Sequence, residues 1–128
     1  MPHKVTYRVY YEDTDAGGIM YHGNYINFCE RARTEFINAK GLSNRAMHDH
    51  HILTVVRHLE AHYFAPAFLE DQVTVHTEVS EIKNSSFVLK QTIFRGEDTL
   101  FMMNIVLVCI NGEKRPVRIP EMLKNILE

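Results

Sequence analysis

A change of pattern within residues 7–37 limits the possible folds of this chain more than any other feature. Residues 7–11 (YRVYY) are rich in aromatic and β-branched side chains, which are typical of a β-strand. From Tyr25 onward the apolar residues recur at steps of four and three, which places them on one face of an α-helix. The members of this face are Tyr25, Cys29, Ala32, Phe36 and Ala39. The pattern predicts a strand that leads through a loop into a long helix of about residues 23–40, which Gly41 ends.

The loop between this strand and this helix is acidic and contains two glycines. Glu12, Asp13 and Asp15 precede Gly17 and Gly18. The loop therefore brings carboxylates close to the unpaired backbone N–H groups of a helix N-terminus. An acid or base beside such an oxyanion-stabilising group indicates acyl chemistry. Aspartate is also a preferred turn and helix-capping residue, so these residues alone leave a structural role for Asp15 open.

A calcium-binding loop is another interpretation of the same segment. Asp13 and Asp15, followed by Gly18, match the beginning of an EF-hand loop. The fifth position would however be Gly17 and the twelfth Asn24, so the terminal glutamate is missing. The sequence therefore predicts no metal site in this loop.

Two histidine-rich segments also have no zinc-site spacing. Residues 48–51 (HDHH) do not share a single helix or strand face, so we expect a solvated loop there. His58, Glu60 and His62 would share one face of a strand, where we expect a structural or interfacial network.

The rest of the chain predicts a sheet with little additional helix. The expected strands cover residues 52–65, 73–80, 87–94 and 100–110, with a short edge at 116–119. The expected short helices cover residues 44–50, capped by Ser43, and 121–127, begun by Pro120. Residues 100–110 are apolar at nearly every position and are expected to form the central strand. This order predicts the α+β class, with a five-stranded antiparallel sheet folded about one helix in a single domain over residues 1–128.

Length and composition are those of an ordinary globular domain. The 128 residues are 45% hydrophobic, and the formal net charge of −2 gives no reason to expect nucleic acid or an anionic membrane as a partner. No apolar run approaches the roughly 20 residues of a spanning helix, and the first residues lack the apolar core of a signal peptide, so we expect a cytoplasmic protein. Cys29 and Cys109 fall in apolar patterns, so we expect two free core thiols and no disulfide.

A long motif at the loop and helix resembles a known family. The motif consists of residues 10–18 (YYEDTDAGG), Tyr21-His22, Asn24-Tyr25 and residues 30–33 (ERAR). It resembles the hotdog-fold acyl-CoA thioesterases of the 4-hydroxybenzoyl-CoA thioesterase family, and most closely their YbgC-type branch. The resemblance implies the hotdog fold and hydrolysis of acyl-CoA to a free acid and CoA, without a metal or organic cofactor. It also implies a dimer with a joined sheet, often paired again into a tetramer.

The same resemblance implies roles for individual residues. Asp15 matches the catalytic carboxylate, which serves as a nucleophile or as a general base toward water. His22 matches a position where the imidazole or only the backbone N–H acts, with Tyr21 and Gly23 beside it as substrate-binding residues. The turn formed by Lys83, Asn84 and Ser85 matches a segment near the CoA phosphates, although one lysine is a weak anion site. An acyl group bound to a carrier protein is therefore an alternative substrate.

Two other functions remain open at this level. A hotdog dehydratase or isomerase would use a histidine and an acid without cleaving the thioester, but Asp15 precedes the helix and no acid lies in the helix stripe. A non-enzymatic adaptor for acyl carrier protein or lipid synthesis is the second alternative. We also expect self-association, because Phe28, Ile37, Met102 and Met103 add apolar surface beyond the helix stripe.

Overall fold

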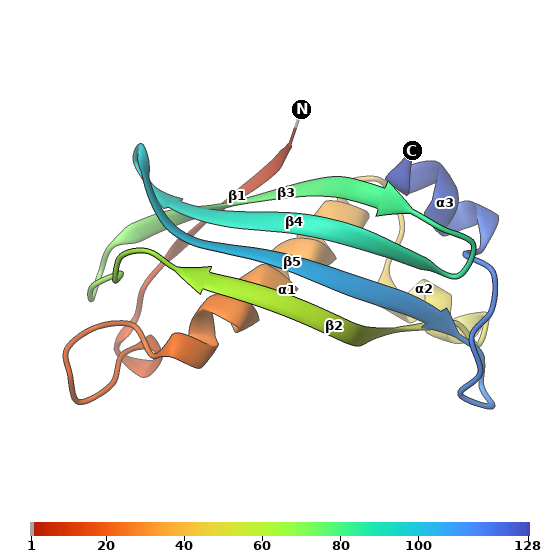
Figure 1. Ribbon diagram of the computed structural model, residues 1–128, viewed down its shortest axis with the longest axis horizontal. Helices are drawn as coiled ribbons and strands as arrows, with labels where there is room; N and C mark the ends of the chain where they lie inside the picture. The colour runs from red at the N-terminus through yellow and green to blue at the C-terminus, as the bar shows by residue number, and fades with distance from the viewer. Residues whose placement is uncertain (1) are drawn as a thin grey trace.

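The computed structural model describes residues 2–128 and contains one five-stranded sheet with a long helix against one of its faces (Figure 1). The strands are β1 (His3–Arg8), β2 (Leu53–Tyr63), β3 (Gln72–Ile82), β4 (Ser86–Arg95) and β5 (Asp98–Ile110). They lie in the order β1-β3-β4-β5-β2, and every neighbouring pair is antiparallel. The hotdog arrangement that the sequence predicts is therefore confirmed.

The long helix, α1 (His22–Asn38), forms because its apolar spacing lets one face pack on the sheet. Tyr25, Cys29, Ala32 and Phe36 are all buried, with 6% exposure or less. The helix ends where Gly41 takes a φ of +90°, a conformation that favours glycine, as the sequence predicts.

The two short helices also follow their local signals. Helix α2 (Asn44–Asp49) is capped by Ser43, whose hydroxyl accepts the Ala46 backbone N–H at 3.0 Å. Helix α3 (Glu121–Leu127) begins directly after Pro120. Within the described residues 2–128, no helix is long and apolar enough to cross a membrane.

Two predictions about the sheet need correction. Residues 100–110 were expected to form the central strand. They belong to β5, which is an interior strand between β4 and β2, but the middle position of the five belongs to β4. Residues 116–119 form no strand, and Pro116 makes only an isolated β-bridge with Ile110. Pro116 lacks the backbone N–H that a longer ladder would require.

The source of exposed apolar surface also differs from the prediction. Phe28 and Met103 are 1% and 0% exposed within a single chain, so they are core residues and require no partner. Strand β2 pairs only with β5 among the described strands, and its Val55 and Val56 are 38% and 49% exposed. The long open edge of β2 therefore presents apolar side chains together with unpaired backbone groups.

Both cysteines are buried and free, as predicted. Burial raises the pKa of Cys29 to about 12 and the pKa of Cys109 to about 11. Both thiols are therefore protonated at neutral pH and belong to the core.

Candidate active site

Asp13 and Asp15 are two residues apart, but the fold gives them opposite environments. Asp13 is only 4% exposed, and its Oδ2 accepts the Tyr10 backbone N–H at 2.8 Å while its Oδ1 accepts Asn24 Nδ2 at 3.0 Å. The Asp13 carbonyl also accepts the Tyr21 backbone N–H at 2.8 Å. Asp13 therefore ties the loop to the beginning of α1 and has no free carboxylate oxygen.

Asp15 is exposed in the turn that follows. Its Oδ1 accepts the Gly17 backbone N–H at 2.8 Å, and its carbonyl accepts the Gly18 N–H at 3.0 Å. Gly18 has a φ of +80°, a backbone conformation that glycine adopts more easily than other residues, so this turn favours a glycine here. No donor in residues 2–128 hydrogen-bonds Asp15 Oδ2. One oxygen is thus oriented by the turn, while the other is free to attack a carbonyl carbon or to accept a proton from water.

The segment after Asp15 is held by the loop between β2 and β3. Asp15 donates its backbone N–H to the Ile19 carbonyl at 3.1 Å, and Met20 donates to the Ala67 carbonyl at 2.9 Å. The Ala67 N–H in turn donates to Tyr25 Oη at 2.9 Å, which joins this loop to α1. The position of Asp15 therefore depends on a segment far along the chain.

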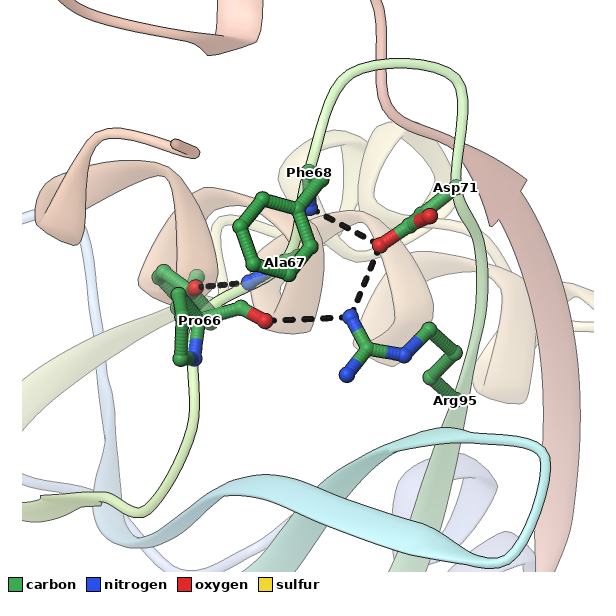
Figure 2. Close-up of polar contacts among 6 residues, drawn as sticks. Pro66, Ala67, Phe68, Asp71 and Arg95 are labelled. Atoms are coloured by element: carbon green, nitrogen blue, oxygen red, sulfur yellow. Dashed lines mark hydrogen bonds and ion pairs between the residues drawn. The ribbon is translucent and has the colours of Figure 1, made fainter. Parts of the chain in front are cut away.

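Figure 2 shows how Arg95 and Asp71 hold this second loop. Arg95 Nη1, at the end of β4, donates to Asp71 Oδ2 at 2.8 Å and to the Pro66 carbonyl at 3.0 Å. Asp71 Oδ2 also accepts the Phe68 backbone N–H at 2.8 Å. The Arg95 guanidinium lies 5.5 Å from the centroid of the Phe68 ring, within cation–π range. The ion pair and its hydrogen bonds therefore fix residues 66–68 against the acidic loop.

The N-terminus of α1 supplies backbone donors. Asn24 donates to the Tyr21 carbonyl at 2.9 Å, but the N–H groups of His22 and Gly23 have no acceptor within the described part of the chain. Tyr63 Oη donates to the His22 carbonyl at 2.7 Å, so the last residue of β2 holds the first turn of the helix. The two free N–H groups are suited to an oxyanion or a polarised carbonyl oxygen.

A cleft of about 340 Å³ joins these features. Its lining residues are Asp15, Ile19, Met20, His22, Tyr25, Tyr63, Phe64, Ala65 and Pro66. The structure thus brings the two predicted catalytic side chains, Asp15 and His22, to one cleft with mainly aromatic and aliphatic walls. Burial raises the pKa of Tyr63, with smaller contributions from Tyr25 and Cys29, so its hydroxyl stays protonated and can keep donating to the helix.

The predicted substrate-binding residues divide into two groups. The Tyr21 ring is 47% exposed and lies 4.4 Å from the His22 ring, measured between centroids. Gly23 lies under the Tyr21 ring, where an added Cβ would approach a ring carbon to 3.0 Å. Lys83 and Ser85 lie in the turn between β3 and β4, at the opposite end of the sheet from the acidic loop of the same chain (Figure 1).

Contacts of that turn are chiefly structural. The Asn84 carbonyl accepts the Ile119 N–H at 2.9 Å, and the Ser85 carbonyl accepts the Cys109 N–H at 2.8 Å. Lys83 Nζ is 3.7 Å from Glu81 Oε1 on an exposed surface, so the lysine is only weakly paired. Within one chain these residues do not reach the cleft.

Sequence reasoning missed the part of the cleft that β2 contributes. Tyr63 and Phe64 line it, and Tyr63 packs edge-on against Tyr25 with 5.3 Å between ring centroids. Two adjacent aromatic residues just before Pro66, at the end of a strand, were the available signal. On the outer face of β2, Glu60 Oε1 lies 3.3 Å from His62 Nε2, consistent with the predicted polar network.

Comparisons with known proteins identify relatives of this chain. A family model described as the thioesterase-like superfamily matches residues 9–127. The chain is 40% identical over 116 residues to "Acyl-CoA thioester hydrolase YbgC" of Escherichia coli O6:H1, covering 89% of this chain and 87% of that protein. It is 37% identical to "Acyl-CoA thioesterase YbgC" of Haemophilus influenzae, covering 91% and 88% of the two chains. The crystal structure of a probable thioesterase from Bartonella henselae superposes with a TM-score of 0.91 at 33% identity, covering 94% of this chain and 100% of that one.

Proposed function

This chain belongs to the thioesterase-like superfamily and is a thioester hydrolase, and we propose that it hydrolyses acyl-CoA to a free carboxylic acid and CoA. One observation carries the proposal. An exposed carboxylate with a free oxygen, Asp15 Oδ2, lines the same cleft as His22, the first residue of α1, whose backbone N–H and that of the adjacent Gly23 have no acceptor among the described residues. Thioester cleavage needs both groups. The N–H groups stabilise the negative charge that develops on the carbonyl oxygen, and the carboxylate attacks the carbonyl carbon or removes a proton from water.

The proposed reaction uses the two features in sequence. The thioester carbonyl oxygen accepts the N–H groups of His22 and Gly23, which polarises the carbonyl carbon. Asp15 then either attacks that carbon, to form an anhydride that water hydrolyses, or removes a proton from the water that attacks. The C–S bond breaks and the CoA thiolate leaves. A thiolate is a good leaving group, so the reaction needs little general-acid assistance.

His22 has a second, smaller role in this proposal. Its imidazole lines the cleft and can hydrogen-bond the attacking water or the departing sulfur. Its backbone N–H can donate to the thioester carbonyl oxygen whichever side chain the residue carries. We assign the larger share of the rate to Asp15 and the backbone donor.

We extend the proposal to the assembly, as a dimer that pairs two β2 edges. The open edge and the exposed Val55 and Val56 support it. If β2 pairs antiparallel with its copy, the partner's sheet runs in the opposite direction to this chain's sheet. The turn with Lys83 of the partner would then come to the same end as this chain's Asp15 cleft, where it could approach the CoA phosphates. A tetramer of two such dimers completes the proposed assembly by resemblance, and we also propose the cytoplasmic location that the sequence pattern leads us to expect.

A thiol-release assay tests the function. The protein is incubated with short, long and aromatic acyl-CoAs, and free CoA thiol is measured for the parent and for Asp15→Asn. We expect release with at least one acyl class, and loss of most of it in the variant. A hotdog dehydratase or isomerase would change the acyl chain without releasing thiol. An adaptor would release no thiol and would still retain its carrier-protein partner after Asp15→Asn.

Light scattering tests the assembly. We expect a dimer or tetramer, and Val56→Lys on the β2 edge should dissociate it and lower turnover, because the second copy would cover the added charge. An active parent monomer of 14.9 kDa would contradict the proposed assembly.

A further inference from the structure

The end of β2 lies beside the first turn of α1, and one side-chain hydrogen bond joins them (Figure 1). Tyr63 Oη donates to the His22 carbonyl at 2.7 Å, although the two residues are 41 positions apart in the chain. The His22 carbonyl and the Gly23 N–H belong to the same planar, conjugated peptide unit. A donor on this carbonyl oxygen therefore orients the Gly23 N–H and makes it a stronger donor, because linked hydrogen bonds polarise one another.

Packing fixes the direction of the Tyr63 hydroxyl. The Tyr63 ring lies edge-on to the Tyr25 ring of α1, with 5.3 Å between centroids, and 4.9 Å from the centroid of the Phe101 ring of β5. Tyr63 and Phe101 are also paired across β2 and β5, and the next residue, Phe64, donates its N–H to the Leu100 carbonyl at 2.8 Å. Both the backbone and the ring of Tyr63 are therefore held in place, although the residue is 47% exposed.

The beginning of α1 has no cap of its own that could do the same. Its N-cap residue is Tyr21, whose side chain makes no capping hydrogen bond, and the first turn contains no acidic residue. Helix starts commonly carry Ser, Thr, Asp or Asn, whose side-chain oxygens occupy the first N–H groups. Among residues 2–128, Tyr63 is the only residue whose side chain hydrogen-bonds the backbone of residues 21–23. The geometry of this turn is therefore fixed from β2, and its N–H groups are left to the cleft.

We propose that Tyr63 is a positioning residue for the hydrolysis, because its hydroxyl orients and polarises the peptide unit whose Gly23 N–H stabilises the charge on the thioester oxygen. The inference rests on the proposed function, which makes that oxygen the acceptor of the N–H groups. Tyr63 acts through the backbone and does not touch the reacting atoms. The effect is largest in the transition state, where the oxygen carries the most negative charge, so loss of the hydroxyl should lower kcat more than it changes KM.

The kinetics of thiol release by Tyr63→Phe test this role. The variant keeps the ring and removes only the hydroxyl. We expect kcat to fall about tenfold, less than the roughly 10²- to 10³-fold loss on removal of an oxyanion donor itself, while KM stays within about twofold. Tyr7→Phe is the matched control, because the Tyr7 hydroxyl is buried without a hydrogen-bond partner in the described chain and Tyr7 does not line the cleft. It should keep the parent's kcat and KM.

Nuclear magnetic resonance of the ligand-free protein tests the polarisation without catalysis. An amide nitrogen responds to a hydrogen bond on the carbonyl of its own peptide unit, because the two atoms share one conjugated system. In Tyr63→Phe we expect the Gly23 ¹⁵N and the His22 carbonyl ¹³C resonances to move upfield. Both should stay in place in Tyr7→Phe. A role of Tyr63 in ring packing alone would move neither resonance, because the phenylalanine ring remains.

The alkaline side of the pH–rate profile gives a third measurement. Ionised Tyr63 cannot donate, so kcat should fall as the pH rises through the Tyr63 pKa. Burial raises this pKa from its ordinary value of 10.0, with smaller contributions from Tyr25 and Cys29, while Asp15 and His22 are the other titratable groups that line the cleft. Replacement of Tyr63 by 3-fluorotyrosine keeps the hydroxyl but lowers its pKa. This protein should regain kcat near neutral pH and lose it at a lower pH than the parent, and Tyr63→Phe should show no such loss.

Three results would overturn the role of Tyr63. These are a kcat of Tyr63→Phe within about twofold of the parent, even with a lower melting temperature, Gly23 resonances that do not move, or a fluorinated protein that loses kcat at the parent's pH. If Tyr63→Phe fails to fold, the fluorinated protein decides the question. Thiol release by the parent without these effects would reject this inference alone. Absence of thiol release by the parent would reject the proposed hydrolysis, while the Gly23 resonance would still decide whether Tyr63 polarises the peptide.

Discussion

Arg95 Nη1 lies 2.8 Å from Asp71 Oδ2, and this ion pair holds the loop between β2 and β3, which supports the cleft (Figure 2). The two side chains are only 30% and 23% exposed, so solvent screens the pair less than it would on an open surface. Both residues lie outside the cleft lining, but the segment between Pro66 and Phe68 that they hold is bonded to the acidic loop.

Arg95→Met should therefore lower both stability and turnover. It removes two hydrogen bonds and leaves Asp71 without its cation, for which we expect a loss of about 1–3 kcal/mol in the free energy of unfolding. Thermal melts and thiol release measure the two effects. Arg45→Met is the matched control, because Arg45 is exposed and makes no ion pair among the described residues. If Arg95→Met keeps the parent's melting temperature and turnover, the ion pair is not required to hold the loop between β2 and β3.

The two loop aspartates should separate activity from stability. Asp15→Asn keeps the shape of the side chain but loses the charge that attacks or deprotonates, so most turnover should disappear while the melting temperature stays near that of the parent. Asp13→Asn should act on stability, because both Asp13 oxygens accept donors and an amide NH₂ would face one of them. We expect roughly 1–3 kcal/mol of destabilisation and the milder loss of turnover for Asp13→Asn. If Asp15→Asn stays within about threefold of the parent, the assignment of the catalytic carboxylate is wrong.

Substitutions of His22 can separate its imidazole from its backbone N–H. If the imidazole positions water or the thioester, His22→Ala should lower turnover by roughly 10²-fold, the modest end of acid–base contributions. We expect this variant to be impaired and Asp15→Asn to be worse. His22→Pro removes the N–H and should be severe in either case, provided that a thermal melt shows a folded protein. Full activity of His22→Ala would leave only the backbone role.

The two thiols should be inert in the folded protein. Because burial raises the pKa of Cys29 to about 12 and of Cys109 to about 11, neither should react with a thiol reagent at pH 8 until the chain is unfolded. The folded pKa values lie above the ordinary value of 9.0, so the unfolded state loses these protons first as the pH rises. The stability that the thiols contribute is therefore intact below about pH 9 and is lost as the pH rises toward 12. Urea melts across this range measure the decline, which Cys29→Ala with Cys109→Ala should reduce. One reactive thiol per native chain would contradict the prediction.

Local pattern was sufficient for the long helix and for strands β2 to β5, but it placed the first strand at residues 7–11, whereas β1 is His3–Arg8. The spacing of Tyr25, Cys29, Ala32 and Phe36 predicts α1, because side-chain direction along a helix is set by its own backbone geometry. The acidic turn and the helix start are adjacent in sequence, so Asp15 and His22 could be proposed together before any long-range contact was known. Gly41 and Ser43 likewise act within a few residues of their positions.

Only the tertiary structure decided which segments complete and support this site. The distinction between buried Asp13 and exposed Asp15 depends on Asn24 and on the packing around it, and two neighbouring aspartates look alike in sequence. Tyr63 reaches the first turn of α1 because β2 runs along the sheet edge toward that end. Strand order results from summed packing between residues far apart in the chain, and no local periodicity records it. For the same reason, the sequence by itself determined that acidic residues stand next to a helix start, while the fold determined that Arg95, far along the chain, holds the loop that supports them.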